Sequence, residues 1–242
     1  MINFSANPPF DLWAVALAWL GYALLHSALA MTRTKRALTR RWPAAARGYR
    51  LAYNGLALLL LAPPIWLTYA ARGEPLWVWH GIFGWLANGV VGAALIGFVL
   101  TLGHYSTAHF LGTLQWRMAA TDAVDEAPLA FSPLHRFVRH PWYFLALLLI
   151  WTRDMDAAHL ISAVVLSVYL VLGSRIEERR LIAAYGETYR RYRRKVPALV
   201  PLPWRSLPRA ALRDLAEGAP STEPAAGPTR QRRTSPEKPQ CP

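Results

Sequence analysis

The distribution of charge along the chain constrains its fold more than any other feature. Asp, Glu, Lys and Arg are all absent from five stretches, 12–32, 51–71, 75–116, 141–152 and 157–174. About 20 apolar residues cross a hydrocarbon core of roughly 30 Å, so stretches of this length are typical of transmembrane helices. A large soluble protein could bury such helices, but 242 residues, of which only 17% are charged, are too few to cover them. The sequence therefore predicts an all-α, polytopic membrane helix bundle.

The positions of the basic residues predict the topology of this bundle. We expect about five transmembrane helices, at 12–30, 51–71, 82–103, 134–152 and 157–174. Seven Lys and Arg residues fall in 31–50 and fifteen follow residue 174, whereas 71–79 and 152–156 carry one each. Under the positive-inside rule this alternation places the N-terminus outside and the C-terminus in the cytoplasm. It also accounts for the net charge of +13 without nucleic-acid binding.

The C-terminal third divides into two segments of different composition. A membrane-embedded domain is expected over 1–204, and its last part, 175–204, is a helical segment in the cytoplasm. Residues 205–242 are rich in Pro, Ala, Ser and charge, with almost no large apolar residues after Leu215. Such a composition cannot bury a core, so we expect a disordered basic tail near anionic lipid headgroups.

The segment RHPWY, 139–143, places polar residues in front of a short apolar run. Only twelve uncharged residues separate His140 from Arg153, and they span about 18 Å as a helix. Either the helix begins earlier, within 132–140, or it forms a shortened hairpin behind other helices. Pro141 suits the first position of a helix and disfavours helical geometry at His140. Arg139 and His140 then either anchor a helix end by snorkelling or hold an anionic group near its N-terminus.

A second polar segment, 174–201, follows the last apolar stretch. At helical spacing one face carries a carboxylate, an isoleucine and three tyrosines, namely Glu178, Ile182, Tyr185, Tyr189 and Tyr192. Such a face suits a pocket for a polar, aromatic or cationic ligand, or an amphipathic helix with tyrosines at the membrane surface. We expect a bend at Gly186 and the end of the helix at Val196-Pro197.

Together these two segments resemble a known family. RHPWY followed by EERRLIAAYGETYRRYRRKVPALVP is similar to the C-terminal half of the isoprenylcysteine carboxyl methyltransferase superfamily. Upstream, HSALA (26–30), YRLAYN (49–54) and HFLGTLQ (109–115) resemble its bacterial branch, which contains methanethiol S-methyltransferases. In the family a Gly usually stands two residues after the Tyr of RHPxY, where this chain has Leu145.

The resemblance implies a methyltransferase of a bacterial inner membrane that uses S-adenosyl-L-methionine at its cytoplasmic side. Its acceptor would be a lipid-soluble thiol similar to methanethiol, or a prenylcysteine carboxylate. The implied catalytic residues are His140 and Arg139, placed at the cofactor carboxylate. Glu178 would bind the ribose hydroxyls or the amino group, with Glu177 as the second choice. The adenine and the sulfonium would be lined by the tyrosines Tyr143, Tyr185, Tyr189 and Tyr192, with Pro141 beside them.

Several histidines have other expected roles. A thiol acceptor reacts as the thiolate, and His140 or His104 would assist its deprotonation. We expect no metal site, because His104 and His109 are five residues apart. For His26, His80 and His159 we expect only packing or interfacial roles.

Two other functions are compatible with the pattern. Membrane sterol and polyprenyl reductases share a related C-terminal pattern, so an NADPH-dependent reductase is one alternative. A non-catalytic scaffold or assembly protein is the other. Binding of S-adenosylmethionine, of NADPH, or of neither distinguishes the three.

Overall fold

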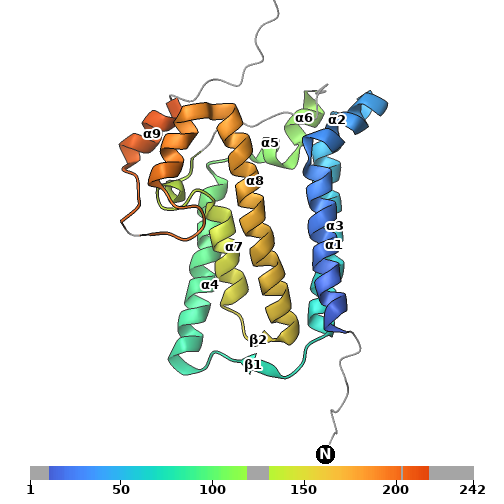
Figure 1. Ribbon diagram of the computed structural model, residues 1–242, viewed down its shortest axis with the longest axis vertical. Coiled ribbons are helices and arrows are strands. Elements are labelled where there is room, and N and C mark those ends of the chain that lie inside the picture. The colour runs from blue at the N-terminus through green and yellow to red at the C-terminus, as the bar shows by residue number, and fades with distance from the viewer. Residues whose placement is uncertain (1–10, 119–130, 203, 218–242) are drawn as a thin grey trace, which may run out of the picture.

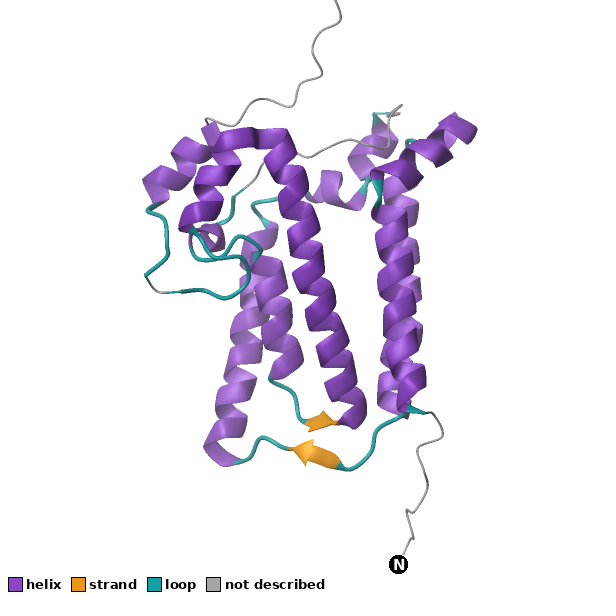
Figure 2. Ribbon diagram, in the orientation of Figure 1, coloured by secondary structure: helices purple, strands orange, loops and turns teal. Residues whose placement is uncertain are grey.

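The computed structural model describes residues 11–118, 131–202 and 204–217, and this part of the chain is almost entirely helical (Figures 1 and 2). Its α-helices are α1 (Leu12–Ala30), α2 (Thr32–Arg41), α3 (Tyr49–Ala70), α4 (Gly81–Leu102), α5 (Thr107–Leu111), α6 (Thr113–Arg117), α7 (Pro141–Trp151), α8 (Ala157–Lys195) and α9 (Arg209–Glu217). Two 3-10 helices are η1 (Pro43–Ala45) and η2 (Pro133–Arg136). Two short strands, β1 (Pro75–Trp77) and β2 (Met155–Asp156), pair antiparallel, with Pro75 opposite Asp156.

The long helices form two groups joined by α8. Helices α1 and α3 pack together on one side, and α4 packs with α7 on the other (Figure 1). Helix α8 contacts α1, α3 and α7, so it lies between the groups. The strand pair lies at one end of the bundle, and α2, α5, α6 and α9 gather at the opposite end (Figure 1).

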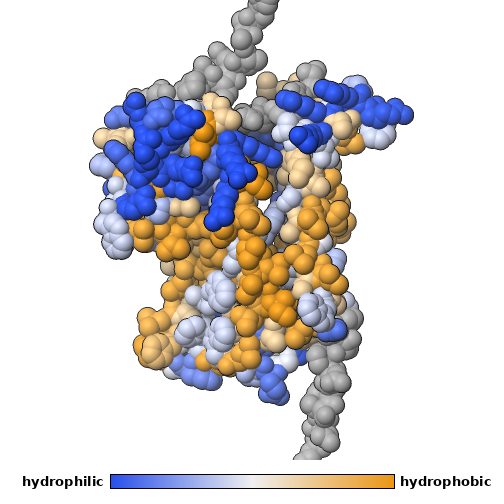
Figure 3. Space-filling view, viewed as in Figure 1, coloured by the Kyte–Doolittle hydropathy of each residue, from blue (hydrophilic) through white to orange (hydrophobic). Residues whose placement is uncertain are grey.

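The surface of the bundle is suited to lipid. Four helices, α1, α3, α4 and α8, are long and apolar enough to cross a membrane. Large apolar side chains point outward from them, and Leu58 and Trp85 are 72% and 78% exposed. Hydrophilic residues gather around α2, α9 and the end of α8, while the middle of the molecule is apolar (Figure 3). The predicted all-α membrane helix bundle is confirmed.

Helix α7 is shorter than expected. It has 11 residues, about 16 Å, and begins at Pro141, not at residue 134. The preceding residues form η2 and an irregular turn, and His140 has φ −122° and ψ 73°. This correction has a local cause, because Pro141 excludes helical geometry from the residue before it. The shortened hairpin is therefore the arrangement that the chain adopts.

Leu145 shows how α7 is accommodated beside α4. This side chain is 5% exposed, and a Cβ built on Gly97 would lie 3.1 Å from its Cδ2 atom. Gly97 thus leaves room for the leucine that stands where the family has glycine. Gly89 and Gly92, by contrast, have nothing within 4 Å of a built Cβ, so close packing is limited to part of the α4 glycines.

Helix α8 corrects a second expected boundary. The apolar stretch 157–174 and the polar segment after it form one helix that continues to Lys195. Its path turns at Gly186, where φ is 54° and ψ is −128°, a conformation that side chains with a Cβ rarely adopt. The bend turns the last part of α8 back across the polar end of the bundle (Figure 1).

The disordered tail was expected to begin at residue 205, but packed structure continues to the end of α9 at Glu217. Leu207 and Leu212 are only 2% and 8% exposed, and α9 packs against the end of α8. Both leucines join a cluster with Tyr185, Tyr189 and Tyr192, which supplies the apolar contacts that composition alone did not reveal. Residues 218–242, the rest of the predicted tail, lie outside the described residues.

A buried polar contact links three membrane helices. The indole Nε1 of Trp19 in α1 lies 3.0 Å from the Thr68 hydroxyl of α3 and 2.8 Å from the Ser162 hydroxyl of α8. The two hydroxyls are 2.9 Å apart. Interhelical hydrogen bonds of this kind favour association where no water competes. They fix the spacing of the helices that form one wall of the site.

Candidate active site at the membrane boundary

Backbone pairing brings the RHPWY segment to the segment that follows α8. The N–H of Arg139 donates to the carbonyl of Pro197 at 2.9 Å, and the N–H of His140 donates to that of Ala198 at 3.1 Å. The end of α8 at Val196-Pro197 frees these carbonyls, as the sequence predicts. Residues almost sixty positions apart thereby form one unit at the N-terminus of α7.

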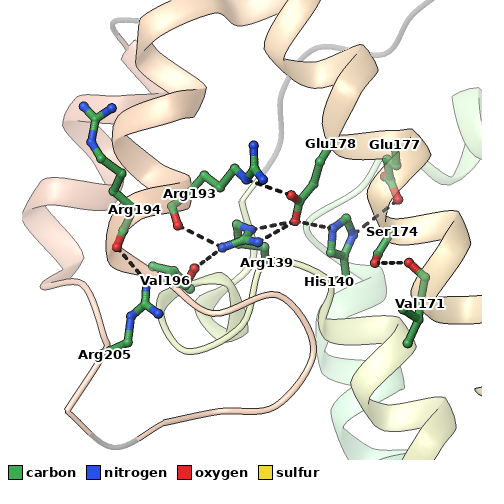
Figure 4. A network of polar contacts seen from close by, with 10 residues as sticks. All are labelled: Arg139, His140, Val171, Ser174, Glu177, Glu178, Arg193, Arg194, Val196 and Arg205. Atoms are coloured by element: carbon green, nitrogen blue, oxygen red, sulfur yellow. Dashed lines mark hydrogen bonds and ion pairs between the residues drawn. The ribbon is translucent and has the colours of Figure 1, made fainter.

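Arg139, Glu178, Arg193 and the carbonyls around them form a network that we call the clamp (Figure 4). The Arg139 guanidinium binds Glu178 Oε1 through Nε at 2.8 Å and through a terminal nitrogen at 2.6 Å. Its other terminal nitrogen donates to the carbonyls of Arg193, at 2.9 Å, and Val196. Arg193 Nε lies 3.1 Å from Glu178 Oε2. The Arg139 and Glu178 side chains are 9% and 8% exposed, so the charges compensate one another away from water.

His140 links the clamp to a second carboxylate. Its Nε2 atom lies 3.3 Å from Glu178 Oε1, and its Nδ1 atom lies 3.3 Å from Glu177 Oε2. Burial lowers the pKa of His140, but hydrogen bonds to Glu177 and Glu178, with the negative charge of both, outweigh it and raise the pKa overall. The ring also stacks on Tyr143, with centroids 5.3 Å apart and planes inclined by 13°. The imidazolium form is therefore favoured beside the exposed carboxylate of Glu177.

Three tyrosines near the C-terminal end of α8 belong to a cluster that shares Val196 with the clamp. Tyr185, Tyr189 and Tyr192 are buried in an apolar cluster with Val196, Leu207 and Leu212. The Tyr192 hydroxyl donates to the His135 carbonyl at 2.8 Å. The Tyr189 hydroxyl is buried and has no hydrogen-bond partner within the described part of the chain. These three tyrosines therefore pack within the protein and are absent from the lining of the cavity described next.

A cavity of about 670 Å³ lies between α1, α3 and α8 and reaches Tyr143 of α7. Its walls are mainly apolar, for example Leu20, Val164 and Val168. Its polar lining residues are His26, Ser27, Tyr53, Tyr143, Tyr169, Glu177 and Arg180. The volume is within the range of about 300–1,000 Å³ that is usual for small-molecule sites. This cavity joins a membrane-embedded apolar space to charged groups at the polar end.

The structure thus divides the predicted site residues between two regions. Glu177 and Tyr143 line the cavity, whereas Arg139, His140 and Glu178 form or adjoin the clamp. Pro141 is buried at the first position of α7. His104, the other histidine expected to assist a thiol, is exposed, is absent from the cavity lining and contacts the Leu100 carbonyl at 3.2 Å.

Five polar residues that line the cavity were not among the predicted site residues: His26, Ser27, Tyr53, Tyr169 and Arg180. His26, Tyr53 and Tyr169 come from three different helices, α1, α3 and α8. A signal for two of them was present, since His26 begins HSALA and Tyr53 lies in YRLAYN. The sequence of these two segments indicates a family resemblance but not a shared cavity, because spacing along one helix does not show which neighbouring helix faces it.

The fold and this site define an integral membrane protein with a charged site at one boundary and an apolar cavity beside it. The chain is 31% identical to the methanethiol S-methyltransferase of Crocosphaera subtropica, covering 74% of this chain and 71% of that protein. It is 35% identical to methanethiol S-methyltransferase 2 of Bradyrhizobium diazoefficiens, covering 74% and 69%. It is also 32% identical to the methanethiol S-methyltransferase of Mycobacterium tuberculosis, covering 79% of each chain.

The chain therefore belongs to the methanethiol S-methyltransferase branch of the isoprenylcysteine carboxyl methyltransferase superfamily, and it is a membrane methyltransferase. The predicted resemblance and enzyme class are confirmed, and neither a reductase nor a scaffold is needed to explain the fold. No family model matches the sequence. No solved structure matches it either.

Proposed function

We propose that this enzyme transfers a methyl group from S-adenosylmethionine to a small alkyl thiol such as methanethiol. One observation carries the proposal: a mainly apolar cavity among membrane helices ends at Glu177 and Arg180. A small thiol partitions into such a space, whereas a charged donor needs the polar end. The names of three relatives, which cover about three quarters of this chain, support the choice of methanethiol.

The residues at the polar end of the cavity fit S-adenosylmethionine. Glu177 offers a carboxylate, 47% exposed, to a cationic or hydroxyl-bearing group, and Arg180 offers a guanidinium to the carboxylate of an amino acid. The ring of Tyr143 is suited to a positively charged sulfur through cation–π attraction. When bound, S-adenosylmethionine supplies an electrophilic methyl group on a sulfonium.

In this proposal the clamp positions residues and does not contact the reacting atoms. Arg139 and Glu178 satisfy each other, and Arg139 also holds the carbonyls after α8. His140 orients Glu177 through Nδ1 and fixes the ring of Tyr143 by stacking. Glu177 therefore takes over the binding role that the sequence analysis gave first to Glu178.

The apolar walls have a second task. A displacement at carbon needs donor and nucleophile held in line, and exclusion of water prevents competing reactions. Side chains such as Leu20 and Val168 provide a dry surface for an uncharged acceptor. The cavity exceeds the needs of a one-carbon thiol, so methanethiol, longer alkyl thiols and a prenylcysteine should be compared as acceptors.

We place the protein in a bacterial inner membrane, with its N-terminus outside and its polar end in the cytoplasm. The support is the concentration of basic residues in α2 and the end of α8, at one end of the bundle (Figure 3). Reporter fusions after residues 30, 70 and 102 test this orientation. If a reporter that is active only in the cytoplasm gives a signal when it is fused after residue 70, the orientation is the reverse of the one proposed.

The first experiment is calorimetric titration of the detergent-purified enzyme with S-adenosylmethionine, with NADPH titrated in parallel. We expect saturable binding of S-adenosylmethionine alone. Headspace gas chromatography then measures dimethyl sulfide formed from methanethiol. If S-adenosylmethionine binds but no methylated thiol forms, the proposed acceptor is wrong. If NADPH alone binds, the proposed donor is wrong.

A further inference from the structure

Two tyrosines and a histidine form a hydrogen-bonded chain on the cavity side of α1 and α3. The Tyr53 hydroxyl lies 2.7 Å from His26 Nε2, and the Tyr22 hydroxyl lies 3.4 Å from His26 Nδ1. The rings are close as well, with centroids 5.2 Å apart for His26 and Tyr53. We call Tyr22, His26 and Tyr53 the relay.

Two members of the relay line the same cavity as the proposed donor site. His26 and Tyr53 line the cavity together with Tyr143 and Glu177. Tyr169 of α8 packs edge-on against His26, with centroids 6.2 Å apart, and its hydroxyl lies 3.3 Å from that of Ser27. The groups that face His26 are thus the tyrosines of α1, α3 and α8, and the charged groups of the cavity wall are Glu177 and Arg180.

A thiol in this cavity requires a proton acceptor. The thiolate is the nucleophile, and apolar surroundings raise the pKa of a thiol and so disfavour ionisation. A neutral imidazole has one nitrogen that accepts and one that donates. In the tautomer protonated at Nδ1, Nε2 accepts from the Tyr53 hydroxyl at 2.7 Å and Nδ1–H faces Tyr22. The Tyr53 oxygen keeps lone pairs that can accept a further proton from the cavity.

We propose that His26, acting through Tyr53, is the base that takes the proton of the thiol acceptor, an inference that rests on the proposed function. The S–H bond breaks, its proton passes to the Tyr53 oxygen, and the Tyr53 proton passes to His26 Nε2. The thiol sulfur forms a bond to the methyl carbon, and the sulfonium carbon–sulfur bond breaks with its electron pair left on the donor sulfur. One positive charge is lost at the sulfonium and one appears on the imidazolium.

The test compares two thiols of different acidity. In His26→Gln, methylation of methanethiol near neutral pH should fall roughly 100-fold, within the range usual for loss of a general base. Methylation of thiophenol, a much stronger acid that is largely ionised in solution, should fall less than threefold. The loss with methanethiol should shrink as pH rises and hydroxide supplies the thiolate. Tyr53→Phe should show the same selectivity, and His80→Gln, an exposed histidine at the start of α4, is the matched control.

Two readouts separate this role from a structural one. Calorimetry should give S-adenosylmethionine affinities within twofold of wild type for His26→Gln and Tyr53→Phe. Without any donor, thiolate absorbance on mixing thiol with the wild-type enzyme should exceed that with His26→Gln. Equal losses with both thiols, or loss of S-adenosylmethionine binding, would overturn the relay while leaving the proposed function intact. A wild-type enzyme that binds the donor but methylates neither thiol would overturn the proposed function and the relay with it.

Discussion

The clamp and the cavity are neighbouring regions that differ in how completely their polar groups are paired. In the clamp, the Glu178 carboxylate meets Arg139 and Arg193, and the Arg139 guanidinium also meets two carbonyls. In the cavity, Glu177 meets His140 with one oxygen and is 47% exposed. The comparison teaches that the residues most conspicuous in the sequence are paired with one another, and in the proposed function the groups that bind a ligand lie beside them.

The largest effect is expected where the clamp is broken. Glu178→Ala leaves Arg139 buried without its carboxylate, and removal of one partner from a buried ion pair costs about 3–5 kcal/mol. We expect a corresponding loss in the free energy of unfolding in detergent, accompanied by loss of S-adenosylmethionine binding. Glu187→Ala is the matched control, since Glu187 pairs with Arg194 at 2.7 Å but is half exposed. Unchanged stability of Glu178→Ala would remove the distinction between clamp and cavity.

The second prediction concerns the pH dependence of stability at His135, which lies in η2. Burial, offset in part by a hydrogen bond to Ser132, lowers the pKa of His135 to about 4. Because the folded pKa lies below the unfolded value near 6.5, the stabilisation is complete above pH 6.5 and is lost as pH falls toward 4. A pKa shift of this size corresponds to a loss of about 3 kcal/mol in the free energy of unfolding.

The measurement is urea unfolding in detergent between pH 4 and pH 7, compared with His135→Gln. The variant lacks the titrating ring, so its stability should vary less over this interval. Parallel pH curves for the two proteins would contradict the assignment to His135.

The third prediction addresses the cavity directly. Glu177→Gln removes a negative charge from the cavity wall but leaves the Arg139–Glu178 pair in place. Hydrogen bonds to charged groups contribute about 1.5–3 kcal/mol, so S-adenosylmethionine affinity should fall roughly 10- to 100-fold. The unfolding free energy should stay within about 0.5 kcal/mol, as for most exposed positions. Calorimetry and unfolding of the same preparation check both, and a variant that loses stability but keeps affinity would assign Glu177 to the clamp.

The smallest effect is expected in the membrane-embedded wall of the cavity. Trp19→Phe removes the indole N–H that binds Thr68 and Ser162, whose hydroxyls still contact each other. Interhelical hydrogen bonds in membranes contribute about 0.6 kcal/mol on average. We expect a loss of that order in unfolding free energy, whereas Trp13→Phe, at a position 74% exposed, should have none. A loss of several kcal/mol would contradict this estimate and show that the contact is a main determinant of how α1, α3 and α8 pack around the cavity.

The sequence determined those features that depend on local patterns. Charge-free stretches predicted the long helices α1, α3, α4 and α8, because a chain in lipid must satisfy its backbone hydrogen bonds within each helix. Gly186 marked the bend in α8 through its own backbone preference, whereas the start of α7, expected at residue 134, lies at Pro141. The motif RHPWY with the paired glutamates identified the family.

Only the tertiary structure decided which of these residues share a site. Helical spacing put Glu178 and the three tyrosines on one face, but it did not show that this face is covered by Leu207 and Leu212 of the following segment. Nor did it show that His26 and Tyr53, on separate helices, contact each other and line the same cavity as Glu177. The physical reason is that periodicity fixes directions within one helix, whereas the partner of each face depends on how the helices pack.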